Sequence, residues 1–184
     1  MVPPGGIRGG RPRLRGEAKP RVDAVPRAEA ATIGKAAPAG EAATRSAPDP
    51  AAAKKRVLFL CIGNSCRSQM AEGFARAYGS DVMTPLSAGL SPAPIVAPLT
   101  KLTLAEKNII IDDQFPKGLD VVAGQPVDLI VNMSGAPLSA TGVRIVEWPV
   151  DDPIGQPEPV YRAVADQIEG LVMRLILELR QTAN

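Results

Sequence analysis

The segment Arg-Val-Leu-Phe-Leu-Cys-Ile-Gly-Asn-Ser-Cys-Arg-Ser-Gln-Met-Ala-Glu, residues 56–72, runs from an apolar stretch through a short loop into sequence with helical periodicity. Residues 57–60 are all apolar, which is typical of a strand buried on both faces of a parallel sheet. Apolar residues from Met70 to Tyr78 recur at helical spacing, and Gly79 is placed to end the helix. The segment therefore predicts a strand, a loop and a helix, with the loop at the helix N-terminus.

The predicted loop is suited to binding a tetrahedral oxyanion, because a helix N-terminus presents free N–H groups and a partial positive charge. Gly63 and Asn64 both tolerate positive φ, so successive N–H groups can converge on one anion. Cys61 begins the loop and Arg67 closes it. Amide dipoles and a guanidinium group favour the nucleophilic thiolate form of cysteine, and the guanidinium can bind two phosphate oxygens at once. The sequence thus predicts a nucleophilic cysteine in an anion-binding loop.

The string Cys-Ile-Gly-Asn-Ser-Cys-Arg-Ser at 61–68 contains the Cys-x-x-x-x-x-Arg-Ser spacing of cysteine-dependent phosphatases. Together with the Met-Ala-Glu helix after it and Ser-Ala-Gly at 87–89, it resembles the low-molecular-weight phosphotyrosine phosphatase family, which includes the related thioredoxin-coupled arsenate reductases. The resemblance implies that Cys61 is the nucleophile, that Asn64 holds the loop in shape and that Ser68 hydrogen-bonds the Cys61 sulfur. The predicted phosphate-binding residues are Ile62, Gly63, Asn64, Ser65, Cys66, Arg67 and Ser68. The structural alternative is a buried cysteine beside a surface arginine.

A second candidate stretch, Trp-Pro-Val-Asp-Asp-Pro at 148–153, carries two carboxyl groups. Thiolate attack on a phosphate ester expels an alkoxide or phenoxide, which leaves faster when an acid protonates it. The resemblance implies that the general acid is Asp152, directly before Pro153, and Asp151 is the alternative acid. The non-catalytic interpretation is a plain turn, since Asp and Pro are common turn residues.

The remainder of the chain alternates predicted strands and helices. We expect further strands near 82–87, 127–133 and 143–148, a helix near 99–108, and a long amphipathic helix beginning near 158. Residues 109–111 are interpreted as a buried connection rather than a strand. This alternation predicts a three-layer α/β/α domain, for which the resemblance implies a four-stranded parallel sheet. The nucleophile loop is then expected at the carboxyl ends of the strands.

The first 55 residues differ from the rest in composition and charge. They contain no aromatic residue, are rich in Ala, Pro, Gly and Arg, and carry eleven Lys and Arg against five Asp and Glu, whereas residues 56–184 carry ten against fourteen. We therefore predict a disordered basic extension over 1–55 and a phosphatase-like domain over 56–184. Because the basic residues are dispersed, we expect no nucleic-acid partner. No apolar segment resembles a signal peptide or a membrane span.

Cysteine and histidine usage bounds the chemistry. The chain has no histidine, and its carboxylates are not clustered at metal-ligand spacing, so we expect no metal and no cofactor. Its two cysteines both lie in the loop, at 61 and 66, which leaves none for a structural disulfide framework. A reducing cytoplasm is the natural compartment for such a chain.

Three functions remain open at this point. The first expectation is a phosphatase of the protein-tyrosine type that hydrolyses phosphomonoesters through a phosphocysteine. Its expected substrate partner is a phosphorylated protein or a small aryl phosphate. We expect a monomer and no membrane partner. Tyrosine-specific members of the family carry aromatic residues just after Asp-Pro, and this chain has Ile154 and Gly155 there. A phosphotyrosine ring therefore loses much of its stacking surface.

The second function is arsenate reduction, and the third is a catalytically silent phosphate-binding module. Gln69, where the phosphatases usually carry proline, is more similar to the arsenate reductases. Thioredoxin-coupled members relay oxidation through two further cysteines after the third strand, where this chain has Ser134 and Thr141 instead. The resemblance therefore implies that any arsenate reduction depends on an external thiol such as glutathione.

Overall fold

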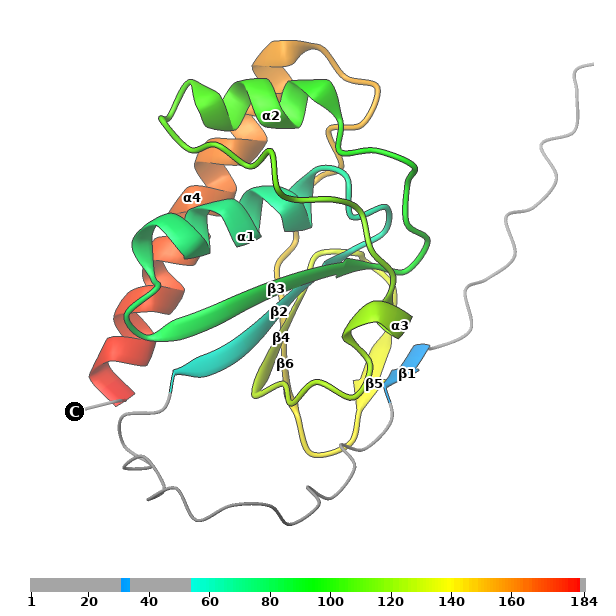
Figure 1. Cartoon of the computed structure of the whole chain (residues 1–184), viewed down its shortest axis with the longest axis vertical. Helices are drawn as coiled ribbons and strands as arrows, with labels where there is room; N and C mark the ends of the chain where they lie inside the picture. Colours follow the sequence, from blue (N-terminus) through cyan, green and yellow to red (C-terminus); the bar gives the residue numbers. More distant parts are fainter. Residues whose placement is uncertain (1–30, 34–53, 183–184) are drawn as a thin grey trace, which may run out of the picture.

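The computed structural model describes residues 31–33 and 54–182. A four-stranded, all-parallel sheet forms the centre of the described part, in the order β3-β2-β4-β6 (Figure 1). The strands are β2 (Lys55–Cys61), β3 (Met83–Gly89), β4 (Leu129–Asn132) and β6 (Arg144–Glu147). β2 pairs on both edges, with Phe59 between Ser87 and Val131, and residues 57–60 are buried, as expected for a central strand.

The helices of the described part cover one face of the sheet far more thickly than the other. α1 (Arg67–Tyr78), α2 (Pro98–Ala105) and α4 (Glu158–Thr182) contribute to one core cluster, which includes Val57 and Phe59 from β2. The opposite face carries the single-turn α3 (Leu119–Val122) and the short strand β5 (Leu138–Ala140), and both pack on Leu58 and Leu60 (Figure 1). The three-layer α/β/α prediction is confirmed, with a thin third layer.

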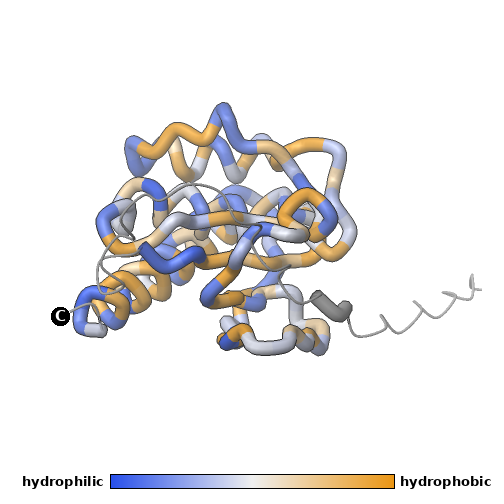
Figure 2. Tube along the Cα trace, turned by 60° about the horizontal axis from the view of Figure 1, so that its bottom comes forward, coloured by the Kyte–Doolittle hydropathy of each residue, from blue (hydrophilic) through white to orange (hydrophobic). Residues whose placement is uncertain are grey.

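The long helix α4 shows why the sequence pattern identifies it. Its buried residues recur three or four apart, so apolar and polar positions alternate along the tube (Figure 2). These buried residues are Tyr161, Val164, Ala165, Ile168, Val172, Leu175, Ile176 and Leu179. This apolar stripe packs mainly against α1. It thereby holds α1, the helix that begins at the nucleophile loop, in place on the sheet.

Three small elements were not expected from the sequence. α3 and β5 are too short to show a periodicity, and β1 (Ala31–Ile33) lies within the extension predicted to be disordered. β1 pairs in parallel with β5, because the free edge of a short strand offers unpaired N–H and C=O groups to another extended segment. The rest of residues 1–53 lies outside the described residues, so the division at residue 55 stays a prediction.

Most other elements lie close to their predicted positions. The helix expected at 99–108 ends at Ala105, and residues 109–111 form a connection in which Ile109 and Ile111 are buried and Ile110 is exposed. In the described part of the chain, no helix combines the length and the apolar character that crossing a membrane requires.

Candidate active site

The loop at 62–66 joins the carboxyl end of the central strand β2 to the first residue of α1. Its carbonyl groups turn outward, toward the segment that follows β3. The carbonyls of Cys61, Ile62, Gly63 and Ser65 accept hydrogen bonds from the backbone N–H groups of Leu90, Ser91, Ala93 and Ala97, at 2.9–3.1 Å. Because the C=O and N–H of a trans peptide point in opposite directions, these peptides turn their N–H groups inward. The loop therefore forms a cradle of amide donors.

The helix that closes the cradle adds positive potential. No side chain of the cap residue bonds to the N-terminus of α1, and its first turn contains no acidic residue, so the helix itself carries no group that neutralises its free N–H groups. Asn64 adopts the left-handed backbone conformation predicted for it, with φ of 45°. Gly89, at the end of β3, lies against this bend, since a Cβ there would stand 2.7 Å from the carbonyl oxygen of Ile62. The loop shape thus depends on the neighbouring strand as well as on its own residues.

Cys61 lies at the base of the cradle, and its side chain is almost fully buried. Its Sγ lies 2.9 Å from Oγ of Ser68 and accepts a hydrogen bond from the backbone N–H of Asn64 at 3.2 Å. These two contacts fix the position of the sulfur at the base of the cradle. The structure brings the predicted nucleophile and the predicted Ser68 partner into direct contact.

Arg67 is buried, with only 4% of its surface exposed, and joins the two halves of the site. Its Nη1 donates to the carbonyls of Met133, at 2.6 Å, and Val150, at 3.1 Å, and its Nη2 pairs with Oδ2 of Asp152. Nε has no hydrogen-bond partner among the described residues. A buried donor of this kind is costly unless a ligand satisfies it, and a bound oxyanion can do so.

Of the two candidate acids, the structure brings Asp152 to the site. Its carboxylate pairs with Arg67, and its Oδ1 accepts from the backbone N–H of Ile154 at 3.3 Å. The Asp152 side chain remains 35% exposed. Asp151 makes no ion pair among the described residues and lines a cavity of about 320 Å³ beside Arg67 and Ser134. Asp152 is thus the better placed of the two.

The second cysteine contacts the long helix α4. The Sγ of Cys66 lies 3.6 Å from the hydroxyl of Tyr161 on α4, and the thiol is buried. Burial raises the pKa of the Cys66 thiol, and its contacts with Thr100 and Tyr161 only partly offset this. Both cysteines are free thiols. Cys66 therefore packs in the core between the loop and the helical layer.

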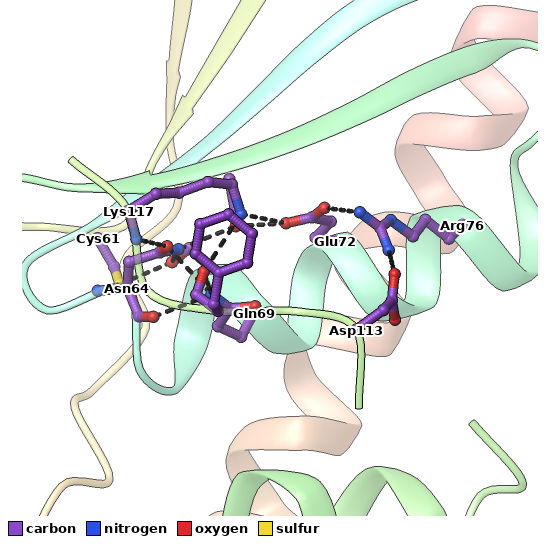
Figure 3. Close-up of polar contacts among 10 residues, drawn as sticks. Cys61, Asn64, Gln69, Glu72, Arg76, Asp113 and Lys117 are labelled. Atoms are coloured by element: carbon purple, nitrogen blue, oxygen red, sulfur yellow. Dashed lines mark hydrogen bonds and ion pairs between the residues drawn. The ribbon is translucent and has the colours of Figure 1, made fainter. Parts of the chain in front are cut away.

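Two polar side chains that the sequence did not assign to the site hold it from behind (Figure 3). The amide of Gln69 donates to the backbone and side-chain oxygens of Asn64, both at 3.0 Å, and to the carbonyl of Phe115 at 3.0 Å. Lys117 donates its backbone N–H to Oδ1 of Asn64 at 2.8 Å. The sequence did offer a signal for Gln69, because it stands where the phosphatases usually carry proline, and proline has no side-chain amide to make these bonds. No sequence signal marked Lys117.

The residues present fit an anion better than a metal. Within residues 31–33 and 54–182, no group of three or more His, Cys, Asp or Glu side chains is placed to hold a metal ion. The loop offers backbone amides and Arg67 at its end adds a guanidinium, and such donors bind oxyanions such as phosphate and arsenate.

Comparisons with known proteins agree with this geometry. The sequence profile of the family "Low molecular weight phosphotyrosine protein phosphatase" matches residues 56–184. "Arsenate reductase 1" of Bacillus cereus is 39% identical over 120 residues, which span 62% of this chain and 89% of that protein. "Glutaredoxin arsenate reductase" of Synechocystis sp. is 32% identical over 130 residues, spanning 68% of this chain and 98% of that protein.

A solved structure described as "An arsenate reductase in the phosphate binding state" has the same fold, with a TM-score of 0.61 and 30% identity. The match covers 68% of this chain and 98% of that one. The profile match spans the whole sheet, the nucleophile loop and the acid loop. This chain belongs to the low-molecular-weight phosphotyrosine protein phosphatase family.

Proposed function

We propose that this chain is an arsenate reductase that takes its electrons from external thiols. Phosphomonoester hydrolysis was the first expectation from the sequence, and arsenate reduction was its alternative. The similar proteins described above carry the name arsenate reductase, which favours the alternative. The proposal assigns catalysis to Cys61, Arg67 and Asp152.

One observation carries the proposal. The site has the hydrogen-bond donors that a small oxyanion needs, but little apolar surface on which an aromatic ring could stack. Inward-facing amides and the unpartnered Nε of Arg67 can satisfy the oxygens of arsenate. Beside the acid, Ile154 is exposed and Gly155 offers no side chain, so neither provides the stacking surface that a phosphotyrosine ring needs. A tetrahedral inorganic anion needs no such surface.

In the first step the Cys61 thiolate attacks arsenic(V), a sulfur–arsenic bond forms and an arsenic–oxygen bond breaks. The departing oxygen takes up protons and leaves as water. Asp152, held beside the anion by Arg67, is placed to supply one of these protons. Arg67 and the amides hold the negative charge that remains on the other oxygens.

In the second step an external thiolate attacks the Cys61 sulfur. A disulfide bond forms between the two sulfurs, the sulfur–arsenic bond breaks, and arsenic leaves with the electron pair as arsenite. A second external thiol then reduces the mixed disulfide and regenerates Cys61. The overall change converts arsenate and two thiols into arsenite, one disulfide and water. External thiols are required because the chain has no cysteine after Cys66.

A phosphatase remains the second candidate, and the position of Asp152 favours it. An acid beside the nucleophile is what a phosphate ester needs when its alkoxide or phenoxide leaves, and mere phosphate binding needs no acid. The same Cys61 attack then forms a phosphocysteine, which water hydrolyses. A cytoplasmic location and a monomeric state stay predictions for either activity.

The deciding experiment measures arsenite release from arsenate and hydrolysis of para-nitrophenyl phosphate with the same preparation. We expect arsenite to form only when an external thiol, such as glutathione with or without glutaredoxin, is present, and not in the Cys61→Ser variant. Phosphate ester hydrolysis without any thiol-dependent arsenite would overturn the reductase proposal and leave the phosphatase. Failure of both assays with tight phosphate binding would indicate the silent module.

A further inference from the structure

An ion pair between Glu72 and Lys117 lies behind the nucleophile loop (Figure 3). Glu72, on α1, is 1% exposed, and the ammonium of Lys117 lies 3.3 Å from its Oε2. The other oxygen, Oε1, pairs with Arg76, which also pairs with Asp113 at 2.7 Å. Burying a carboxylate is costly unless its oxygens are paired, so a charge in this place calls for an explanation.

The pair fixes the direction of one hydroxyl group. Ser87, on β3, donates its only hydroxyl proton to Oε2 of Glu72. Both Glu72 oxygens accept hydrogen bonds, Oε1 from Arg76 and Oε2 from Ser87. With its proton committed, the Ser87 oxygen can only accept, and it does so from Lys117 Nζ at 3.2 Å and from Asn64 Nδ2 at 2.9 Å.

The side-chain amide of Asn64 is likewise held in one orientation. Its Oδ1 accepts from the backbone N–H of Lys117 and from Gln69, and a backbone N–H can only donate. Its Nδ2 therefore faces the two serines and donates to Ser87 and, at 2.8 Å, to Ser68. The amide cannot be turned over without losing these partners.

The orientation of Asn64 in turn fixes the direction of the Ser68 hydroxyl. Because its oxygen already accepts from Asn64, its single proton is free for the Sγ of Cys61, 2.9 Å away. A hydroxyl that donates to sulfur stabilises the thiolate relative to the thiol. The hydrogen bonds thus run in one direction, from the buried ion pair through Ser87, Asn64 and Ser68 to the nucleophile.

We propose that Glu72 and Lys117 are positioning residues that keep Ser68 turned toward the Cys61 sulfur as a proton donor. Neither touches the anion or the reacting atoms. The other charged or titratable groups near Cys61 are Arg67 with its partner Asp152, and the Cys66 thiol, and those around Glu72 are Arg76 with Asp113. The inference does not depend on which reaction the site performs, since both begin with the Cys61 thiolate.

The test measures how fast iodoacetamide, a neutral reagent that the lysine charge does not steer, alkylates Cys61, with mass spectrometry of the Cys61 peptide as readout. In Lys117→Met we expect a rate at pH 7 reduced roughly tenfold, with recovery toward the wild-type rate at high pH, where the thiolate forms without help. Ser68→Ala should be slowed at least as much. Combined with Ser68→Ala, Lys117→Met should add less than about a twofold loss, because the effect passes through Ser68.

Lys101→Met is the matched control. Lys101 pairs with Asp112 at the surface and, among the described residues, makes no ion pair with Glu72, so its variant should alkylate at the wild-type rate. If Lys117→Met melts early because Glu72 loses its partner, the neutral pair Glu72→Gln with Lys117→Met restores the fold and should still alkylate slowly. A wild-type alkylation rate in the folded Glu72→Gln, Lys117→Met double variant would overturn the proposal. So would a combined Ser68→Ala, Lys117→Met variant whose rate loss equals the product of the two single losses.

Discussion

The two loops that meet at Arg67 are built in opposite ways. The nucleophile loop is buried from Asn64 to Cys66, and its carbonyls have backbone partners on the segment 90–97. The acid loop at 148–153 is anchored by the buried side chains at positions 148 and 150. Trp148 packs on Phe59 with ring centroids 5.9 Å apart, Val150 is buried, and Asp151 and Asp152 face outward.

This difference separates binding from proton transfer. The anion cradle is set by the fold itself, because its amides are oriented by buried backbone hydrogen bonds. The acid depends on one partly exposed ion pair with Arg67, and a bound anion must share that same guanidinium. Changes to the cradle are therefore expected to cost more activity than changes to the acid, and the following variants test that order.

Loss of the nucleophile should have the largest effect. Cys61→Ser is expected to reduce turnover at least about a thousandfold, while phosphate binding, measured by calorimetry, persists because the amides and Arg67 remain. Turnover within about tenfold of wild type would remove Cys61 from the mechanism.

Arg67→Lys should come next, because it damages both loops. Lysine keeps the charge but loses the planar arrangement that binds the anion and reaches Met133 and Val150. We expect kcat/KM to fall roughly a hundredfold or more, with weaker phosphate binding. Arg144→Lys, at a surface arginine that pairs with Glu178, is the control, and near-normal turnover in Arg67→Lys would contradict the double role.

Asp152→Asn should have a smaller and more selective effect. Aryl phosphates with poor leaving groups are expected to slow roughly tenfold to a hundredfold, and those with good leaving groups much less, since only the former need the proton. A series of substituted phenyl phosphates measures this dependence. Asp151→Asn should leave the series unchanged, and equal slowing of all substrates by Asp152→Asn would point to a folding defect instead.

The smallest expected effect concerns Cys66. Its pKa is raised by burial, so it stays a protonated thiol at neutral pH, and the nucleophile Cys61 is the expected first target of peroxide. A sulfenic acid on Cys61 could then be captured by Cys66 before further oxidation. We expect Cys66→Ala to regain less activity than wild type when dithiothreitol follows peroxide. Equal recovery, with no bridge in mass spectra, would make Cys66 only a packing residue against Tyr161.

The sequence could predict those structural features that depend on residues close together along the chain. The buried strand at 57–60, the loop with Asn64 at positive φ and the helix ended by Gly79 all follow from local patterns. The acid loop was expected at the same end of the sheet as Cys61 because both loops follow strands of one parallel sheet, whereas the ion pair between Arg67 and Asp152 was not predicted.

The remaining features join segments that only the packed fold brings together. Lys117 lies 53 residues from Asn64 in sequence, and nothing in its own surroundings marks it. Ser87 was predicted only as part of a strand end, without its bond to Glu72. The pairing of β1 with β5 likewise depends on a three-residue edge that shows no pattern of its own.

The close contact of Gly89 with the nucleophile loop also has a consequence for folding. Cys61 and Gly89 are register partners at the ends of β2 and β3, and these strands are joined by the α1 crossover. Parallel pairing of this kind is non-local and forms slowly compared with a helix. The loop can take its final curvature only once that pairing exists, because Gly89 is part of the surface that it rests on. A newly made chain therefore carries an ordinary cysteine, and the reactive one arises only when the sheet is assembled.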